Sequence, residues 1–159
     1  MKHFFQAPIA FEPQDHGAGP LWWGVAPNPS AWQAFALAAH RQGGRLATLW
    51  GSDERPSGKG FQVHALYGVD AGHVALSLQL PPAAPCYPDL SGVFPAANRL
   101  QRAVFDLTGI AHDGPDQRPW LRHNGWPSDW FPLRHDAGDP PPHDNTPSDY
   151  AFVPMGGEG

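Results

Sequence analysis

The chain has 159 residues and a formal net charge of −5 at neutral pH. Its length fits one domain with a real hydrophobic core, and the acidic balance provides no basic field for nucleic acid or an anionic membrane surface. No stretch approaches the roughly 20 apolar residues of a membrane span, so we expect no direct membrane insertion. The single cysteine, Cys86, excludes an intramolecular disulfide and favours a reducing, cytoplasmic compartment.

The N-terminal part of the chain gives only weak structural signals. A strand is expected around "HFFQAPIAF" (residues 3–11), which lacks the apolar core of a signal peptide. Trp22 and Trp23 then require burial. Whether residues 1–28 extend a sheet or wrap around it stays open at this stage.

The first helix is predicted in "PSAWQAFALAAHRQGG" (residues 29–44). Ser30 is the candidate N-cap and Gly43 the residue that ends the helix. Apolar side chains repeat at helical spacing and form the expected buried stripe: Trp32, Phe35, Ala36 and Ala39.

Three strands are expected next, at Arg45–Gly51, Phe61–Gly68 and His73–Leu80, where apolar and polar residues alternate. Their short polar connections imply an antiparallel meander. With one helix before the strands and one after, we predict a two-layer α+β domain. Its antiparallel sheet has three or four strands, with both helices on one face.

The second helix is predicted around "QRAVFDLTGI" (residues 101–110), with Pro95 near its start and Gly109 as its left-handed C-terminal cap. Its buried stripe would consist of Leu100, Val104 and Leu107. Arg102 and Asp106 lie off that stripe, so spacing alone predicts an exposed ion pair one turn apart.

The chain after this helix lacks periodicity. We expect residues 111–136 to form an extended segment packed by its Trp rings, which completes a domain over residues 1–136. Residues 137–159 are rich in Pro and Gly and are predicted to be a flexible tail.

A search for catalytic chemistry finds no convincing constellation. "GSDERPSGKG" (residues 51–60) lacks the spacing of a phosphate-binding loop and is better explained as a hairpin loop. His and Asp residues between 112 and 144 do not fall at metal-ligand spacings. A metal-dependent hydrolase that uses the His and Asp residues from His112 to Asp144 nevertheless stays open as an alternative, and replacement of His123 and His135 would test it.

The order of the residues carries a resemblance over roughly residues 46–136, by strand layout at first and by motifs from Pro95 onward. The blocks "RAVFDLTGI", "GPDQR", "WP" and "PLRHD" resemble the 30 kDa subunit family of respiratory NADH:quinone oxidoreductase, complex I. They look closer to the related N-terminal domain of formate-hydrogenlyase and hydrogenase-4-type [NiFe] hydrogenase large subunits. The chain departs from the family pattern E-R-E, since Gln101 and Ala103 replace its two Glu residues. Thr108 and His135 also replace the family's usual Phe and Lys.

The resemblance implies a role without chemistry of its own. A member of this family would bind no cofactor, while iron–sulfur clusters or Ni–Fe lie on partner subunits. It would dock as an assembly subunit on the large catalytic subunit of a hydrogenase or NADH:quinone oxidoreductase, peripheral to the inner membrane. A chain of this length would act in trans. The expected partner-interface residues are Arg102, Asp106, Gly109, Pro115, Asp116, Arg118, Trp126, Pro132, Leu133, Arg134 and Asp136. A free-standing binding module of the same fold is the alternative.

Overall fold

A computed structural model describes residues 9–15, 19–122 and 126–140. Its main sheet has five strands in the order β1-β2-β5-β4-β3. The strands span Phe11–Gln14 (β1), Leu21–Ala26 (β2), Arg45–Glu54 (β3), Gly60–Val69 (β4) and Gly72–Leu80 (β5). The expected antiparallel meander is confirmed in β3, β4 and β5, whose alternating segments pair through two hairpins.

The sheet contains one parallel pair that the sequence did not predict. β2 runs parallel to β5, with Trp22 opposite Val74, and β1 adds an antiparallel edge strand. The sheet is therefore mixed and has five strands, not three or four antiparallel ones. Because α1 (Pro29–Arg41) intervenes between β2 and β3, no hairpin turn fixes the direction of β2. Most of the strand expected at residues 3–11 lies outside the described residues.

α1 lies on one face of the sheet. Its predicted stripe is confirmed, since Trp32, Phe35, Ala36 and Ala39 are fully buried. The Phe35 ring lies 5.2 Å from the Tyr67 ring of β4. The N-cap is Asn28, whose side chain accepts the Ala31 N–H at 2.9 Å, and not Ser30. Pro29 explains the difference, because it takes the first helical position, where a missing N–H costs nothing.

α2 (Ala97–Thr108) covers the same face and packs along β3. The packing is close at Gly51 of β3, where an added Cβ would lie 3.1 Å from Val104 of α2 and 2.8 Å from Ile110, just after the helix. Since Gly51 pairs with Val63, and Val63 shares its face of β4 with Tyr67, both helices cover one side of the sheet. The two-layer α+β prediction is confirmed.

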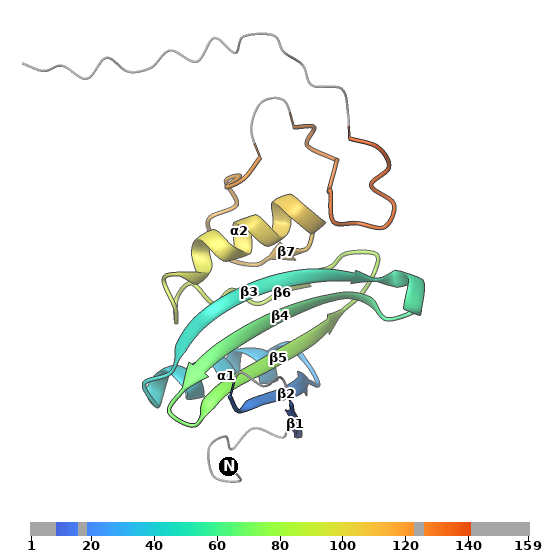
Figure 1. Ribbon diagram of the computed structural model, residues 1–159. Helices are drawn as coiled ribbons and strands as arrows, with labels where there is room; N and C mark the ends of the chain where they lie inside the picture. The colour runs from blue at the N-terminus through green and yellow to red at the C-terminus, as the bar shows by residue number, and fades with distance from the viewer. Residues whose placement is uncertain (1–8, 16–18, 123–125, 141–159) are drawn as a thin grey trace, which may run out of the picture.

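Two short elements and an irregular segment complete the described structure. β6 (Cys86–Tyr87) precedes α2 in the sequence, β7 (Ala111–His112) follows it, and the two strands pair in parallel. η1 (Arg55–Ser57) is a single 3₁₀ turn in the β3–β4 hairpin. We call residues 113–122 and 126–140 the arm. The described part of the arm contains no helix or strand. Most of it lies beyond α2 from the sheet (Figure 1), while its end reaches the β3–β4 hairpin.

Candidate functional site

Asp106 connects α2 to the arm. Its residue is only 1% exposed, and its Oδ2 accepts the backbone N–H groups of Trp120 and Leu121, each at 2.7 Å, and that of Arg122 at 3.2 Å. A carboxylate that receives several backbone N–H groups is a strong acceptor. The prediction of an exposed ion pair with Arg102 is therefore wrong, because Asp106 points into the turn of the arm.

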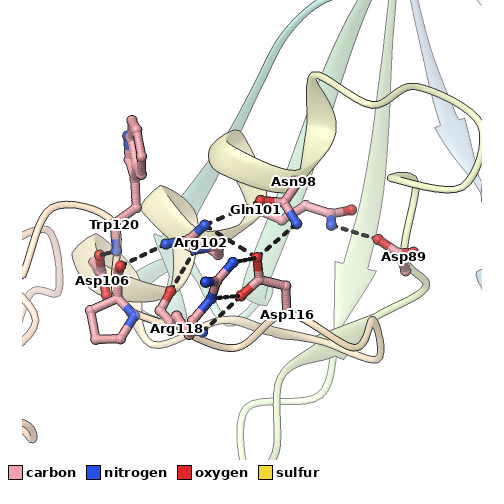
Figure 2. A network of polar contacts seen from close by, with 9 residues as sticks. Asp89, Asn98, Gln101, Arg102, Asp106, Asp116, Arg118 and Trp120 are labelled. Carbon is pink, nitrogen blue, oxygen red and sulfur yellow. Dashed lines mark hydrogen bonds and ion pairs between the residues drawn. The ribbon is translucent and has the colours of Figure 1, made fainter.

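Arg102 holds the arm one turn earlier along α2. Its Nε donates to the Arg118 carbonyl at 2.5 Å, and its Nη2 donates to the Pro119 carbonyl at 2.8 Å. Its Nη1 lies 3.2 Å from Asp116. Figure 2 shows the Arg102 guanidinium among these groups. The fork geometry of arginine allows one side chain to satisfy two carbonyls and a carboxylate.

Asp116 is the arm's own acceptor in this network. Arg118 Nε and Nη2 both donate to it at 2.8 Å, and Asn98 of α2 adds a bond at 3.1 Å. The hydrogen bonds from Arg118 and Asn98 hold the pKa of Asp116 well below its ordinary value. Asp116 therefore stays ionised and links the arm to α2.

Gly109 and Arg134 meet at the C-terminal end of α2. Gly109 has the predicted left-handed conformation, with φ of 71°. Arg134 Nε donates to the Thr108 carbonyl at 2.6 Å, which the helix leaves without an intrahelical partner. The Arg134 guanidinium occupies the space that a Cβ on residue 109 would take. Glycine is thus required here for both its conformation and its size.

The end of the arm returns to β3. Arg55 Nη2 lies 2.6 Å from Asp53 and 2.6 Å from Asp136, and the His135 N–H donates to Asp53 at 3.0 Å. Hydrogen bonds from Arg55, and a further one from His135, hold the pKa of Asp53 well below its ordinary value. Arg55 and Asp53 were not predicted to be site residues. Their only sequence signal is a two-residue spacing in a hairpin loop.

Gln101 replaces a charged Glu of the family pattern, and in the structure its side chain makes buried hydrogen bonds. It is fully buried, its Oε1 accepts the Leu90 N–H at 2.8 Å, and its Nε2 donates to Asp89 at 2.6 Å. Figure 2 shows Gln101 reaching toward Asp89 on the side of α2 away from Trp120. An amide fits this position because it must both accept and donate.

The other expected interface residues lie along the arm. The Trp126 and Trp130 rings pack edge to face at 5.7 Å, as expected of a segment packed by its aromatic rings. The Leu133 N–H donates to the Leu107 carbonyl at 3.0 Å, while Leu133 is 57% exposed. Pro115 is exposed and Pro132 is half-buried. Residues 141–159 of the predicted tail lie outside the described residues.

A second polar cluster lies on the opposite face of the sheet. Trp23 Nε1 donates to Ser77 Oγ at 2.9 Å, so the Ser77 hydroxyl proton is available to His64 Nδ1 at 2.7 Å. His64 Nε2 then faces Ser52 Oγ at 3.0 Å. Burial lowers the pKa of His64 to about 4. The chain of bonds crosses four strands and holds a neutral imidazole.

The two described histidines considered for a metal site, His112 and His135, lie in different parts of the structure. His112 is buried against Tyr87, whereas His135 lies at the end of the arm beside Asp53. His123 and His143 lie outside the described residues. Within residues 9–15, 19–122 and 126–140, no group of three or more His, Cys, Asp or Glu side chains is placed to hold a metal ion.

None of the described helices has the length and apolar character needed to cross a membrane. The chain is 31% identical over 104 residues to formate hydrogenlyase subunit 5 of Escherichia coli (strain K12), a match that covers 63% of this chain and 18% of the relative. This chain therefore spans less than a fifth of that relative's length.

Solved structures that share the fold include the following two. The trypsin-resistant fragment (1–134) of Nqo5 superposes with a TM-score of 0.56 and 25% identity, over 67% of this chain and 89% of that one. A chain of the membrane-bound sulfane sulfur reductase, an archaeal respiratory membrane complex, superposes with a TM-score of 0.61 over 82% of this chain and 78% of that one. Its identity is 17%, so that likeness concerns the fold alone.

The family model described as respiratory-chain NADH dehydrogenase, 30 Kd subunit, matches residues 25–141. That range begins in β2 and includes α1, the meander, α2 and the arm as far as the structure describes it. The resemblance found in the blocks after Pro95 is thereby confirmed and extended toward the N-terminus. The chain belongs to the 30 kDa subunit family of the respiratory-chain NADH dehydrogenase.

Proposed function

We propose that this chain is a non-catalytic docking subunit that packs against the large catalytic subunit of a [NiFe] hydrogenase or an NADH:quinone oxidoreductase. Iron–sulfur clusters or a Ni–Fe centre would lie on its partners. The complex would keep this chain in the cytoplasm at the membrane surface. Family membership supports a subunit role, and the geometry of the arm supports docking.

The observation that carries the proposal is an arm without regular structure that other parts of the chain hold at several points. α2 and the β3–β4 hairpin hold the arm through Arg102, Asp106, Arg55 and Asp53. These bonds fix the backbone before any partner arrives, so docking would lose little conformational entropy. An irregular segment that is held at several points is suited to present a binding surface to a partner.

The arm also exposes apolar side chains. Trp120 is 46% exposed, Leu121 42% and Leu133 57%. Large apolar side chains fixed on the surface are typical of interfaces that a partner covers. Arg102, Asp106 and Asp116, also expected at the interface, hold the arm within this chain, so their contribution to docking would be to position these apolar residues.

The test is capture of the partner from membranes of the organism that makes the protein, with the tagged chain as bait and mass spectrometry as readout. We expect to recover a hydrogenase or NADH:quinone oxidoreductase large subunit in an amount nearly equal to that of the bait. Leu133→Asp should reduce the capture strongly, because a carboxylate would be desolvated at the interface. Val25→Asp is the matched control, since Val25 is 58% exposed on β2.

Two outcomes would contradict the proposal. In the first, the bait emerges alone from membranes that demonstrably contain the large subunit, which would favour the free-standing module. In the second, the large subunit is captured equally well by wild type and by Leu133→Asp, which would exclude this part of the arm from docking.

A further inference from the structure

Two guanidinium groups of α2 lie over the Trp120 ring. The Cζ atoms of Arg99 and Arg102 are 5.0 and 5.4 Å from its ring centroid. Its backbone nitrogen is fixed by Asp106 at 2.7 Å, and its ring points away from the polar network (Figure 2). Trp120 is nevertheless 46% exposed, so part of its aromatic surface is available to a partner.

The charges around this ring are unbalanced. Asp116 is the ion-pair partner of both Arg102 and Arg118, so one carboxylate serves two arginines. Arg99 is exposed and forms no ion pair with any carboxylate of the described residues. Arg118 still leaves 78% of its side chain exposed. The surface is locally positive on a protein with a net charge of −5.

We propose that Arg99, Trp120 and Arg118, the Trp120 patch, bind an acidic segment of the partner polypeptide. An apolar side chain of that segment would cover the free part of the Trp120 ring, and its carboxylates would pair with Arg99 and Arg118. Trp and Arg are the residue types that contribute most at interface centres. This inference rests on the proposed function and specifies the chemistry of the partner's side.

Covering the ring would strengthen the patch. Exclusion of water lowers the local dielectric, and both the cation–π contacts and the new ion pairs then become stronger. A carboxylate opposite Arg99 would complete a charge that the described structure leaves unpaired. A basic or purely apolar partner segment would leave Arg99 uncompensated, which is costly on burial.

The experiment measures the dissociation constant for the large subunit captured in the membrane experiment, purified and immobilised, at low and high salt. Arg99→Glu should raise the dissociation constant by about tenfold at low salt and by less at high salt. Trp120→Ala should raise it by at least about tenfold at both. The controls are Arg41→Glu and Leu37→Ala, which alter exposed residues of α1 and should leave the constant unchanged.

Each outcome decides a different question. If the wild-type chain does not bind the large subunit, the proposed function is wrong and this inference is wrong with it. If the wild-type chain binds and Arg99→Glu has no effect, the acidic segment is excluded while the docking function stands, whatever Trp120→Ala does. Within the described structure Arg99 donates no hydrogen bond to the arm, so Arg99→Glu leaves the hydrogen bonds of the arm in place and removes the cation–π contact with Trp120.

Discussion

The carboxylate of Asp106 holds the backbone of Trp120, with 2.7 Å between Asp106 Oδ2 and the Trp120 nitrogen. The two residues are separated by 14 positions in the sequence. The same oxygen also accepts the N–H of Leu121. One buried side chain of α2 therefore fixes the part of the arm that carries its most exposed aromatic ring.

Asp106→Asn should loosen the arm. The amide keeps the shape of the carboxylate but lacks its charge, and hydrogen bonds to a charged acceptor contribute about 2 kcal/mol. We expect urea unfolding to show a loss of about 2 kcal/mol, and amide exchange at residues 120–122 to become faster. Asp129→Asn, a change at an exposed position of the arm, is the control. Unchanged exchange at residues 120–122 would contradict the role given to Asp106.

Gly51→Ala should destabilise the contact between β3 and α2. The new Cβ would lie 2.8 Å from Ile110 and 3.1 Å from Val104, so the helix must shift or side chains must leave their preferred rotamers. Overpacking of this kind costs roughly 1–3 kcal/mol. Thermal unfolding measures the loss, and Gly92→Ala is the control because a Cβ there meets nothing within 4 Å. Equal melting temperatures for the two variants would show that α2 does not pack tightly on Gly51.

His64 should make stability depend on pH in a defined range. Burial lowers its pKa from 6.5 to about 4, so between these values the unfolded chain binds a proton that the folded chain does not. Stability is full above about pH 6.5 and is lost as the pH falls toward 4, by about 3 kcal/mol in total. The nearby carboxylate of Glu54 acts in the opposite direction.

The measurement for His64 is the free energy of unfolding from pH 7.5 to pH 4 for wild type and His64→Gln. Glutamine can still donate and accept but does not titrate. The variant should therefore show a smaller slope than wild type. Burial also lowers the pKa of His112, so the difference between the two curves, and not either curve alone, reports on His64. Parallel curves would refute this assignment.

Arg55→Ala should release the end of the arm from β3. The Asp53 side chain is only 1% exposed, and without Arg55 its charge keeps only backbone donors. We expect a loss of about 2 kcal/mol and faster amide exchange at His135. Lys59→Ala, an exposed change in the same hairpin, should have no such effect. If His135 exchanges at the wild-type rate in Arg55→Ala, the arm is held there by other contacts.

The sequence predicted the parts of the fold that local patterns determine. Alternation identified β3, β4 and β5, and helical spacing identified the buried stripe of α1, because each pattern reflects a face buried in one layer. The placement of β2 beside β5 could not be predicted, since it depends on contacts such as Trp23 with Ser77, 54 residues apart. Parallel pairing leaves no turn signal in the sequence.

In the candidate site, too, local patterns predicted less than the contacts between distant residues determine. The family motif predicted Arg102, Asp106, Asp116 and Arg118 as partner-interface residues, which stays a prediction, whereas spacing along a helix predicted the wrong environment for Asp106. Its partners are backbone groups of the arm, and a periodicity argument contains no information about a segment without periodicity. The burial of Gln101 could not be predicted for a related reason, because its partners, Asp89 and Leu90, lie outside the helix.

The contact between His135 and Asp53 joins residues 82 positions apart. Closing so long a loop has a large entropic cost, so this contact should form after the meander and α2 are in place. The arm is thus a unit that can open while the sheet stays folded. By thermodynamic linkage, any partner that binds only the closed arm will also protect the tip of the β3–β4 hairpin, which it does not need to touch.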